Sequence, residues 1–333
     1  MGNGKLVKND VVLTTRGSIG NIGWYDEEIY RKIPYARINS GMLILRSNNK
    51  DMASFVSQFL MSTKGKRQID RISFGSAQPQ LTKKDIKLYR IDFPQIKEQQ
   101  KIGDFFSKLD RQIELEEQKL EKLEQQKKGY MQKIFSQELR FKDENGNDYP
   151  EWKHKQIKDI AFLSAGKAKS NENFGQYIIM DMGSVTKSGN MLIHKTTSKS
   201  NDLIKKGELV MPKDDIGGGH IIGKAVYIPE SNKYVLGDHV YKITPKNDNG
   251  LFLHFQINSP NVNKSLKRKV TGSAQLGLNK KSVEEEMLKV PTIEEQNKIG
   301  DFLIKFDKFI EKQSNKIEIL KIRKRGFLQK MFV

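Results

Sequence analysis

Residues Glu98 to Phe135 read EQQKIGDFFSKLDRQIELEEQKLEKLEQQKKGYMQKIF, and residues Glu294 to Phe332 read EEQNKIGDFLIKFDKFIEKQSNKIEILKIRKRGFLQKMF. Aligned at a constant offset of 197 residues and without a gap, the two stretches are identical at 19 of 38 positions. Similarity of this extent indicates an internal repeat. We therefore analyse the chain as two related halves.

Both stretches carry apolar residues at alternating steps of four and three, which is typical of a coiled coil. We expect two helices of roughly 57 Å, each burying its apolar stripe against the other. Two positions of the stripe are polar in both copies, at Glu116 and Lys127 in the first. The same spacing continues to Phe327 and Met331. The expected seam residues are Ile102, Phe106, Leu109, Ile113, Leu120, Leu123, Ile299, Leu303, Phe306, Ile310, Ile317 and Leu320.

The repeat extends upstream of the helices into two globular regions. The sequence Gly-Ser-Ala-Gln occurs at 75–78 and again at 272–275, and residues 6–20 resemble residues 203–217 at the same offset of 197. Short apolar runs bounded by Gly, Asn or Pro predict strands at 11–14, 42–46, 209–211, 225–228 and 239–244. Helices are expected around 53–62 and 251–259. Each half is thus predicted to be a mixed α/β domain that leads into a long helix, an α+β architecture overall.

These features give a domain plan with a polar, turn-rich linker in its middle. We predict a first globular domain at 1–93, a first helix region at 94–140, a linker at 141–150, a second globular domain at 151–290 and a second helix region at 291–333. The second domain has about 50 residues before its match to Leu6 begins, and the first has almost none. We therefore expect a first domain that is shortened at its N-terminal side, or a chain that needs a companion fragment.

Composition narrows the class of function. The chain has no cysteine, which excludes disulfides and thiolate metal sites, and no apolar run long enough to span a membrane. We expect a soluble, cytoplasmic protein. Its 59 basic residues exceed its 40 acidic residues by 19. A surplus of this size favours a polyanionic partner, and nucleic acid is the first candidate.

Basic clusters surround both Gly-Ser-Ala-Gln segments. No acid occurs from Asn249 to Val283, and Asp70 is the only acid between Asp51 and Asp85. Lysine and arginine neutralise phosphates, whereas serine and glutamine can also bond to base edges. The candidate DNA-binding residues are Lys64, Lys66, Arg67, Arg71, Ser76, Gln78, Lys83, Lys84, Lys213, His220, Lys264, Lys267, Arg268, Lys269, Ser273, Gln275, Lys280 and Lys281.

The motifs that suggest catalysis are weak. Residues 218–224 read GGHIIGK, but Ala225 stands where a nucleotide-binding loop needs Ser or Thr to hold Mg²⁺. A tight turn or a glycine-rich loop near DNA is the better interpretation. The five histidines have no metal-ligand spacing, and no sequence typical of an adenine methyltransferase occurs. We predict neither a catalytic site nor a metal site in this chain.

Two globular regions that each end in Gly-Ser-Ala-Gln, followed by a helix that opens Glu-Gln-x-Lys-Ile-Gly-Asp-Phe at Glu98 and Glu295, resemble the specificity subunit of type I restriction–modification systems. The resemblance covers nearly the whole chain. It implies two target-recognition domains that each read half of a split double-stranded DNA target, and two antiparallel helices as a spacer with pseudo-two-fold symmetry. It also implies two methyltransferase subunits and restriction subunits as partners, which would hold S-adenosylmethionine, ATP and Mg, while this chain is not an enzyme and holds no cofactor.

An alternative is a coiled-coil scaffold whose basic domains bind RNA or other nucleic acid with low specificity. RNA-binding surfaces commonly interleave aromatic residues with basic ones, because bases stack on aromatic rings. The first basic cluster contains only Phe74, and the stretch from Lys264 to Lys281 contains no aromatic residue. This composition favours duplex DNA.

Overall fold

The computed structural model describes residues 4–47, 49–73, 80–272 and 276–332 and divides into two compact units. Unit 1 comprises Met1–Glu121 and Glu311–Val333, and unit 2 comprises Lys122–Ile310. This division does not follow the predicted domain boundaries, because each of the two long helices contributes one part to each unit. The boundaries at 93, 140, 150 and 290 remain a prediction. Within the described residues, no helix is long and apolar enough to cross a membrane.

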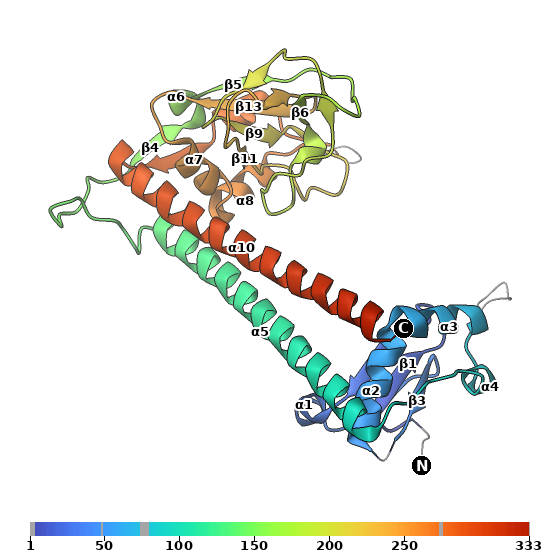
Figure 1. The fold of residues 1–333 in the computed structure, drawn as a ribbon. Coiled ribbons are helices and arrows are strands. Elements are labelled where there is room, and N and C mark those ends of the chain that lie inside the picture. Colours follow the sequence, from blue (N-terminus) through green and yellow to red (C-terminus); the bar gives the residue numbers. More distant parts are fainter. Residues whose placement is uncertain (1–3, 48, 74–79, 273–275, 333) are drawn as a thin grey trace. The chain divides into compact units, whose positions relative to one another are not determined.

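Unit 1 is a three-stranded sheet with helices (Figure 1). Its elements are β1 (Asp10–Thr14), β2 (Ile22–Tyr25), α1 (Glu27–Lys32), β3 (Met42–Leu45), α2 (Lys50–Met61), α3 (Thr63–Ser73), α4 (Lys83–Ile86), the first part of α5 (Ile96–Phe135) and the last part of α10 (Ile293–Met331). The predicted strands at 11–14 and 42–46 and the helix near 53–62 correspond to β1, β3 and α2.

The sheet of unit 1 has the order β2-β1-β3, with antiparallel pairing throughout. Alternation along β1 turns Val11 and Leu13 inward, where they are 1% and 0% exposed. They belong to a core cluster with Ala53 and Leu60 of α2 and Ile69 of α3. One face of the sheet is therefore covered by helices.

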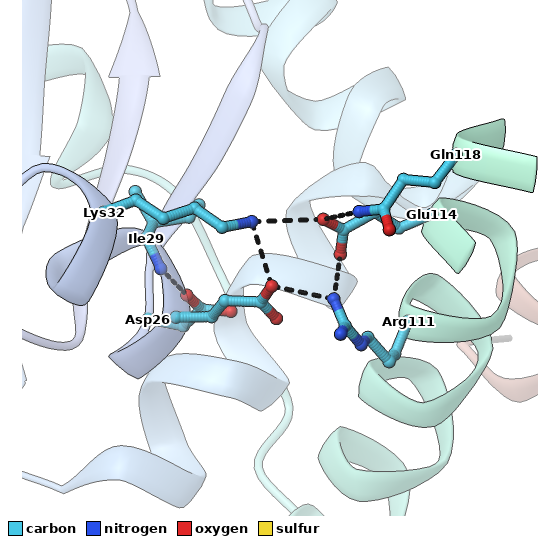
Figure 2. A network of polar contacts seen from close by, with 7 residues as sticks. Asp26, Ile29, Lys32, Arg111, Glu114 and Gln118 are labelled. Carbon is cyan, nitrogen blue, oxygen red and sulfur yellow. Dashed lines mark hydrogen bonds and ion pairs between the residues drawn. The ribbon is translucent and has the colours of Figure 1, made fainter. Parts of the chain in front are cut away.

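A polar network joins α1 to the first part of α5 (Figure 2). Arg111 donates to Glu28 at 2.8 Å and to Glu114 at 2.9 Å. Lys32 lies 2.9 Å from the Glu28 carboxylate and 3.2 Å from that of Glu114. Asp26 caps α1 by accepting from the backbone N–H of Ile29. These charges alternate in sign around a partly exposed site, so they fix the orientation of α1 more than they stabilise the fold.

Unit 2 is larger and contains two four-stranded sheets (Figure 1). Its elements are β4 (Lys153–Gln156), α6 (Ile157–Ile160), β5 (Ala161–Ala165), β6 (Tyr177–Met180), a 3₁₀ turn (Met182–Ser184), β7 (Thr196–Thr197), β8 (Leu203–Ile204), β9 (Leu209–Pro212), β10 (Asp214–Asp215), β11 (Val226–Tyr227), β12 (Tyr234–Leu236), β13 (Val240–Pro245), α7 (Gly250–Ile257), α8 (Pro260–Arg268), β14 (Leu276–Gly277), α9 (Lys280–Glu284) and β15 (Met287–Val290), with the last part of α5 and the first part of α10.

The first sheet of unit 2 has the order β11-β9-β13-β5, and the second has the order β7-β6-β12-β8. Both faces of the first sheet are buried. Leu209 and Met211 of β9 join a cluster that includes Phe252 of α7 and Leu266 of α8. Val210, between them, joins a second cluster with residues of β6 and β12. The first sheet is thus enclosed between helices and the second sheet.

The turn before the central strand has the same hydrogen bonds in both units. In unit 1 the N–H of Val7 donates to the Asp10 carboxylate at 2.8 Å, and in unit 2 the N–H of Lys205 donates to the Glu208 carboxylate at 2.6 Å. The residue before the acid has a positive φ in each case, 72° at Asn9 and 92° at Gly207. The alignment of residues 6–20 at an offset of 197 was wrong by one residue, because these hydrogen bonds match one residue further along.

The helices α5 and α10 run antiparallel within each unit, and the contacts of the two units correspond. In unit 1, Phe105 and Phe327 have ring centroids 5.0 Å apart, and Lys324 lies 2.6 Å from Asp110. Adding the repeat offset to one member of each pair and subtracting it from the other gives two contacts of unit 2. These are Tyr130 with Phe302, at 5.2 Å between centroids, and Lys127 with Asp307.

None of the twelve expected seam residues is exposed: Phe106, Ile299 and Leu303 are fully buried, and the others are buried or half-buried. The extension of the stripe to Phe327 and Met331 was wrong, since both are 40% exposed. Leu328 and Phe332 are buried in their place. A straight helix drifts relative to a strict seven-residue repeat, which moves the buried face by one position near the end.

Candidate DNA interface

The glycine-rich loop of unit 2 connects β9 to β11 and packs on α8. Gly218, Gly219 and Gly223 have φ values of 86°, 79° and 73°, which other residues rarely adopt. A Cβ atom at Gly223 would lie 3.1 Å from the Leu266 side chain, and the Asn263 amide donates to the Gly223 carbonyl at 2.8 Å. The glycines therefore let the loop lie directly against the basic helix α8.

The segment that follows α8 returns to the same loop. Strand β14 pairs with β10, and the N–H of Leu278 donates to the Lys213 carbonyl at 2.7 Å. Thr271 and Gly277 exchange backbone hydrogen bonds at 2.9 and 2.8 Å, so the two ends of the intervening segment are held together. The predicted contacts Ser273 and Gln275 fall in that segment and lie outside the described residues.

Helix α8 presents cations that no acid neutralises. Lys264, Lys267 and Arg268 are exposed, and neither they nor Lys213, which precedes the loop, form an ion pair within the described part of the chain. Lys224, at the end of the loop, is half-buried. Burial, together with the positive charge of Lys267, lowers the pKa of Lys224. Two cations held close together without an acid form a favourable site for a phosphate group.

Three of the other predicted cations of unit 2 are paired with acids. Lys269 lies 2.6 Å from the buried Glu286, and Lys280 and Lys281 lie 3.4 and 3.8 Å from Glu284 and Glu285 on α9. The two pairs on α9 are solvent-exposed and weak. We therefore assign phosphate contact first to the residues of α8 and the loop.

The histidines of this region have structural roles or are exposed. His220 is exposed within the loop. His239 lies 2.7 Å from Asp214, and His254 is buried with its Nδ1 atom 3.0 Å from the Ala225 carbonyl. Burial, with the nearby charges of Lys127 and Lys224, lowers the pKa of His254 to about 3. Among the residues that the structure describes, no three His, Cys, Asp or Glu residues are grouped to hold a metal ion.

Unit 1 repeats the arrangement on a smaller scale. The loop between β1 and β2 lies on α3, because a Cβ atom at Gly20 (φ 85°) would approach the Ile69 side chain to 3.3 Å. The N–H of Leu81 donates to the Thr15 carbonyl at 3.0 Å, as Leu278 does to Lys213 in unit 2. The chain entering α4 therefore passes beside this loop.

The predicted cations of unit 1 lie on α3 and α4. Lys66, Arg67 and Arg71 on α3, and Lys83 and Lys84 on α4, are exposed and form no ion pair with another described residue. Lys64 lies 3.2 Å from Asp92. Ser76 and Gln78 lie outside the described residues. The structure thus brings the basic residues of α3 together with the loop, as it does for α8.

Two basic residues of this surface were not predicted. Lys224 was considered only as part of a nucleotide-binding motif, although its place at the end of a glycine-rich, acid-free loop could have indicated it. Arg16 is exposed in the loop of unit 1 and donates to the Gln80 side chain at 3.2 Å. It occupies the place that Lys213 has in unit 2, so the repeat itself contained the signal.

The chain was compared with known proteins. A model of the type I restriction modification DNA specificity domain matches residues 3–125 and 149–321. The MjaVIII type I restriction enzyme specificity subunit of Methanocaldococcus jannaschii is 24% identical over 310 residues, which is 86% of this chain and 72% of that protein.

Solved structures share the fold. The S subunit of the type I restriction–modification system from M. genitalium superposes with a TM-score of 0.67 at 16% identity, covering 98% of this chain and 83% of that one. A chain from a structural study of complex assembly and conformational transition in a type I system gives 0.57 at 16% identity, with coverage of 98% and 82%. Because the family model matches both halves of the sequence, the chain belongs to the family of type I restriction modification DNA specificity domains.

Proposed function

We propose that this chain is the DNA specificity subunit of a type I restriction–modification complex and that each unit contacts one half of a split duplex target. The observation that carries the proposal is the unneutralised group of Lys224, Lys267 and neighbouring cations where a glycine-rich loop meets α8. In unit 1 the cations of α3 take the same place beside the loop that contains Arg16. Cations without acids supply phosphate contacts, and the adjoining loops supply polar groups for bases.

We further propose that α5 and α10 form an antiparallel coiled-coil spacer and that the chain is a pseudo-two-fold repeat. The paired contacts that differ only by the repeat offset support this symmetry. So does Gln313, which donates to the Glu116 carboxylate at 2.7 Å: these two residues are each other's counterparts in the repeat. A residue that contacts its own counterpart lies at the symmetry axis. The spacer would set the distance between half-sites, as dimer geometry does in other DNA-binding proteins.

The family implies partners for this chain. We propose that two methyltransferase subunits and the restriction subunits assemble on it and that S-adenosylmethionine, ATP and Mg are bound by those subunits. This chain would then be a non-catalytic subunit that supplies DNA specificity. Its coiled-coil scaffold and its DNA-binding surfaces would be parts of one function.

The experiment that tests DNA binding is a salt titration with duplex DNA and with RNA of the same sequence. For duplex DNA, the logarithm of the binding constant should fall linearly with that of the salt concentration, with a slope of about −0.9 per phosphate contacted. Binding should be stronger for the duplex than for single-stranded or double-stranded RNA. Equal binding to RNA would favour the low-specificity scaffold instead.

A further inference from the structure

The edge of the sheet differs between the two units. In unit 2, β13 pairs with β9 on one side and with β5 on the other, where Lys242 is opposite Ser164. In unit 1, β3 holds the place of β13 but pairs only with β1 among the described residues. The N–H of Thr15 donates to the Gly41 carbonyl, and because antiparallel bonds alternate, the N–H of Ile44 faces away from β1. Strand β3 therefore presents an edge that can accept another strand.

The outer face of the sheet differs as well. In unit 2, Val210 and Val240 are 0% exposed beneath β6 and β12 of the second sheet. Their counterparts in unit 1 are Val12 and Met42, on the face opposite to the helices, and both are only half-buried. This apolar face has no second sheet over it within the described residues of unit 1.

A third difference lies just before the long helices. Val290 of β15 pairs with β4 and is 2% exposed, whereas its counterpart Phe93 is 49% exposed. Glu295 is fully buried and accepts a hydrogen bond from the indole N–H of Trp152 at 3.1 Å. Its counterpart Glu98 is exposed.

All of these covering elements of unit 2 come from one stretch of the chain, residues 151–201, which supplies Trp152, β4, β5, β6 and β7. The undescribed residues next to this face of unit 1 are only 1–3, and β5 alone has five residues. We propose that unit 1 is a docking site for a separate polypeptide whose segment resembles residues 151–201. That segment adds a strand to β3 and covers Val12, Met42 and Phe93. Strand addition supplies affinity through main-chain hydrogen bonds and specificity through alternate side chains.

The test uses the full chain and, as probe, a separately made polypeptide of residues 150–201. Saturating probe should slow hydrogen exchange of the Ile44 amide at least tenfold, because that N–H becomes bonded to the added strand. The variant Val12→Lys should abolish the effect, since it places a charge under the docked segment. The matched variant Val7→Lys should leave it intact, because Val7 is 41% exposed and its counterpart is already Lys205.

The remaining outcomes would overturn the proposal. If the probe protects Ile44 only when it is fused ahead of Gly4, the covering segment acts within one polypeptide. If the full chain alone is a dimer with Ile44 already protected, a second copy is the occupant. If neither the free nor the fused probe slows exchange, the edge of β3 is not a docking site. The inference does not depend on DNA binding, and a duplex titration of the same samples would separate the two failures.

Discussion

Units 1 and 2 build the same turn and the same loop but surround them differently. The buried acid that receives the turn N–H is Asp10 in one and Glu208 in the other, and the following strand is the centre of its sheet in both. Unit 2 encloses that sheet on two faces, whereas unit 1 covers one. The common part therefore comprises the central strand, the loop and the basic helix, which are the elements that we assign to DNA.

The difference teaches where each unit obtains its stability. Unit 2 completes its core with the segment of residues 151–201, which reaches the start of α10 through Trp152 and Glu295. In unit 1 the corresponding positions at the start of α5 face solvent. Substitutions at equivalent positions should therefore have unequal effects, and these pairs give direct tests.

The largest effect is expected at Glu295. Its carboxylate is fully buried, accepts from Trp152 and lies 2.8 Å from Arg140. Glu295→Ala leaves Arg140 without its partner and should destabilise unit 2 by about 3 kcal/mol. The matched change Glu98→Ala, at an exposed counterpart, should cost about 0.5 kcal/mol or less. Urea unfolding of both variants measures this difference, and equal losses would show that the two helix starts are equally buried.

Acid should destabilise unit 2 through His254. Its pKa is about 3 in the folded protein and about 6.5 when unfolded, so the folded state resists protonation. Stability from this residue is complete above pH 6.5 and is lost as the pH falls toward 3, by about 1.4 kcal/mol per pH unit.

The counterpart of His254 is Ser57, which does not titrate, so unit 1 lacks this source of acid sensitivity. Unfolding followed by Trp152 fluorescence in a Trp24→Phe background reports on unit 2. His254→Asn should flatten its pH dependence between 6.5 and 4. An unchanged slope would assign the acid sensitivity to other groups.

A smaller effect is expected for DNA affinity. Lys267→Ala removes a cation that faces Lys224 without an acid, and it should reduce the magnitude of the salt slope for duplex binding by about 0.9. Lys206→Ala is the control, because Lys206 precedes β9 whereas the loop follows that strand. Equal slopes for the two variants would remove α8 from the interface. Arg71→Ala, on the equivalent helix of unit 1, shows whether unit 1 contributes in the same way.

The smallest effect concerns the polar network of Figure 2. Arg111 contacts Glu28 and Glu114, but all three side chains are between 35% and 47% exposed. Arg111→Ala should therefore change the stability of unit 1 by about 0.5 kcal/mol or less, and added salt should remove the change. Lys108→Ala, at an exposed position of α5, is the matched control in thermal unfolding. A loss of several degrees specific to Arg111 would mean that the network stabilises unit 1.

The repeat made much of this fold predictable. Strong periodicity predicted both long helices, and short apolar runs predicted β1, β3, β9 and β13. The one-residue shift at the turn was not predictable, because Asn9 and Gly207 share a left-handed conformation but not a residue type. Nor did the heptad pattern show the exchange of Phe327 for Leu328, which depends on how the last turns of α10 pack.

The candidate site was predictable in composition and less so in detail. Absence of acids correctly directed attention to α8, where Lys264, Lys267 and Arg268 have no acid partner among described residues. Sequence could not show that Lys269 contacts Glu286, because that acid lies 17 residues further along and is brought near only by folding. Lys224 was missed because its half-burial beside Lys267 is a tertiary effect.

The measurement that tests the central claim most directly is the methylation pattern of DNA from cells that express this chain with its modification subunit. We predict a split motif with a fixed gap. Insertion of seven residues after Glu116 and again after Gln313 should lengthen the gap by about three base pairs, at 1.5 Å per residue and 3.4 Å per base pair, and leave both half-sites unchanged. An unsplit motif, or a gap that ignores the insertions, would contradict two recognition units held apart by a helical spacer.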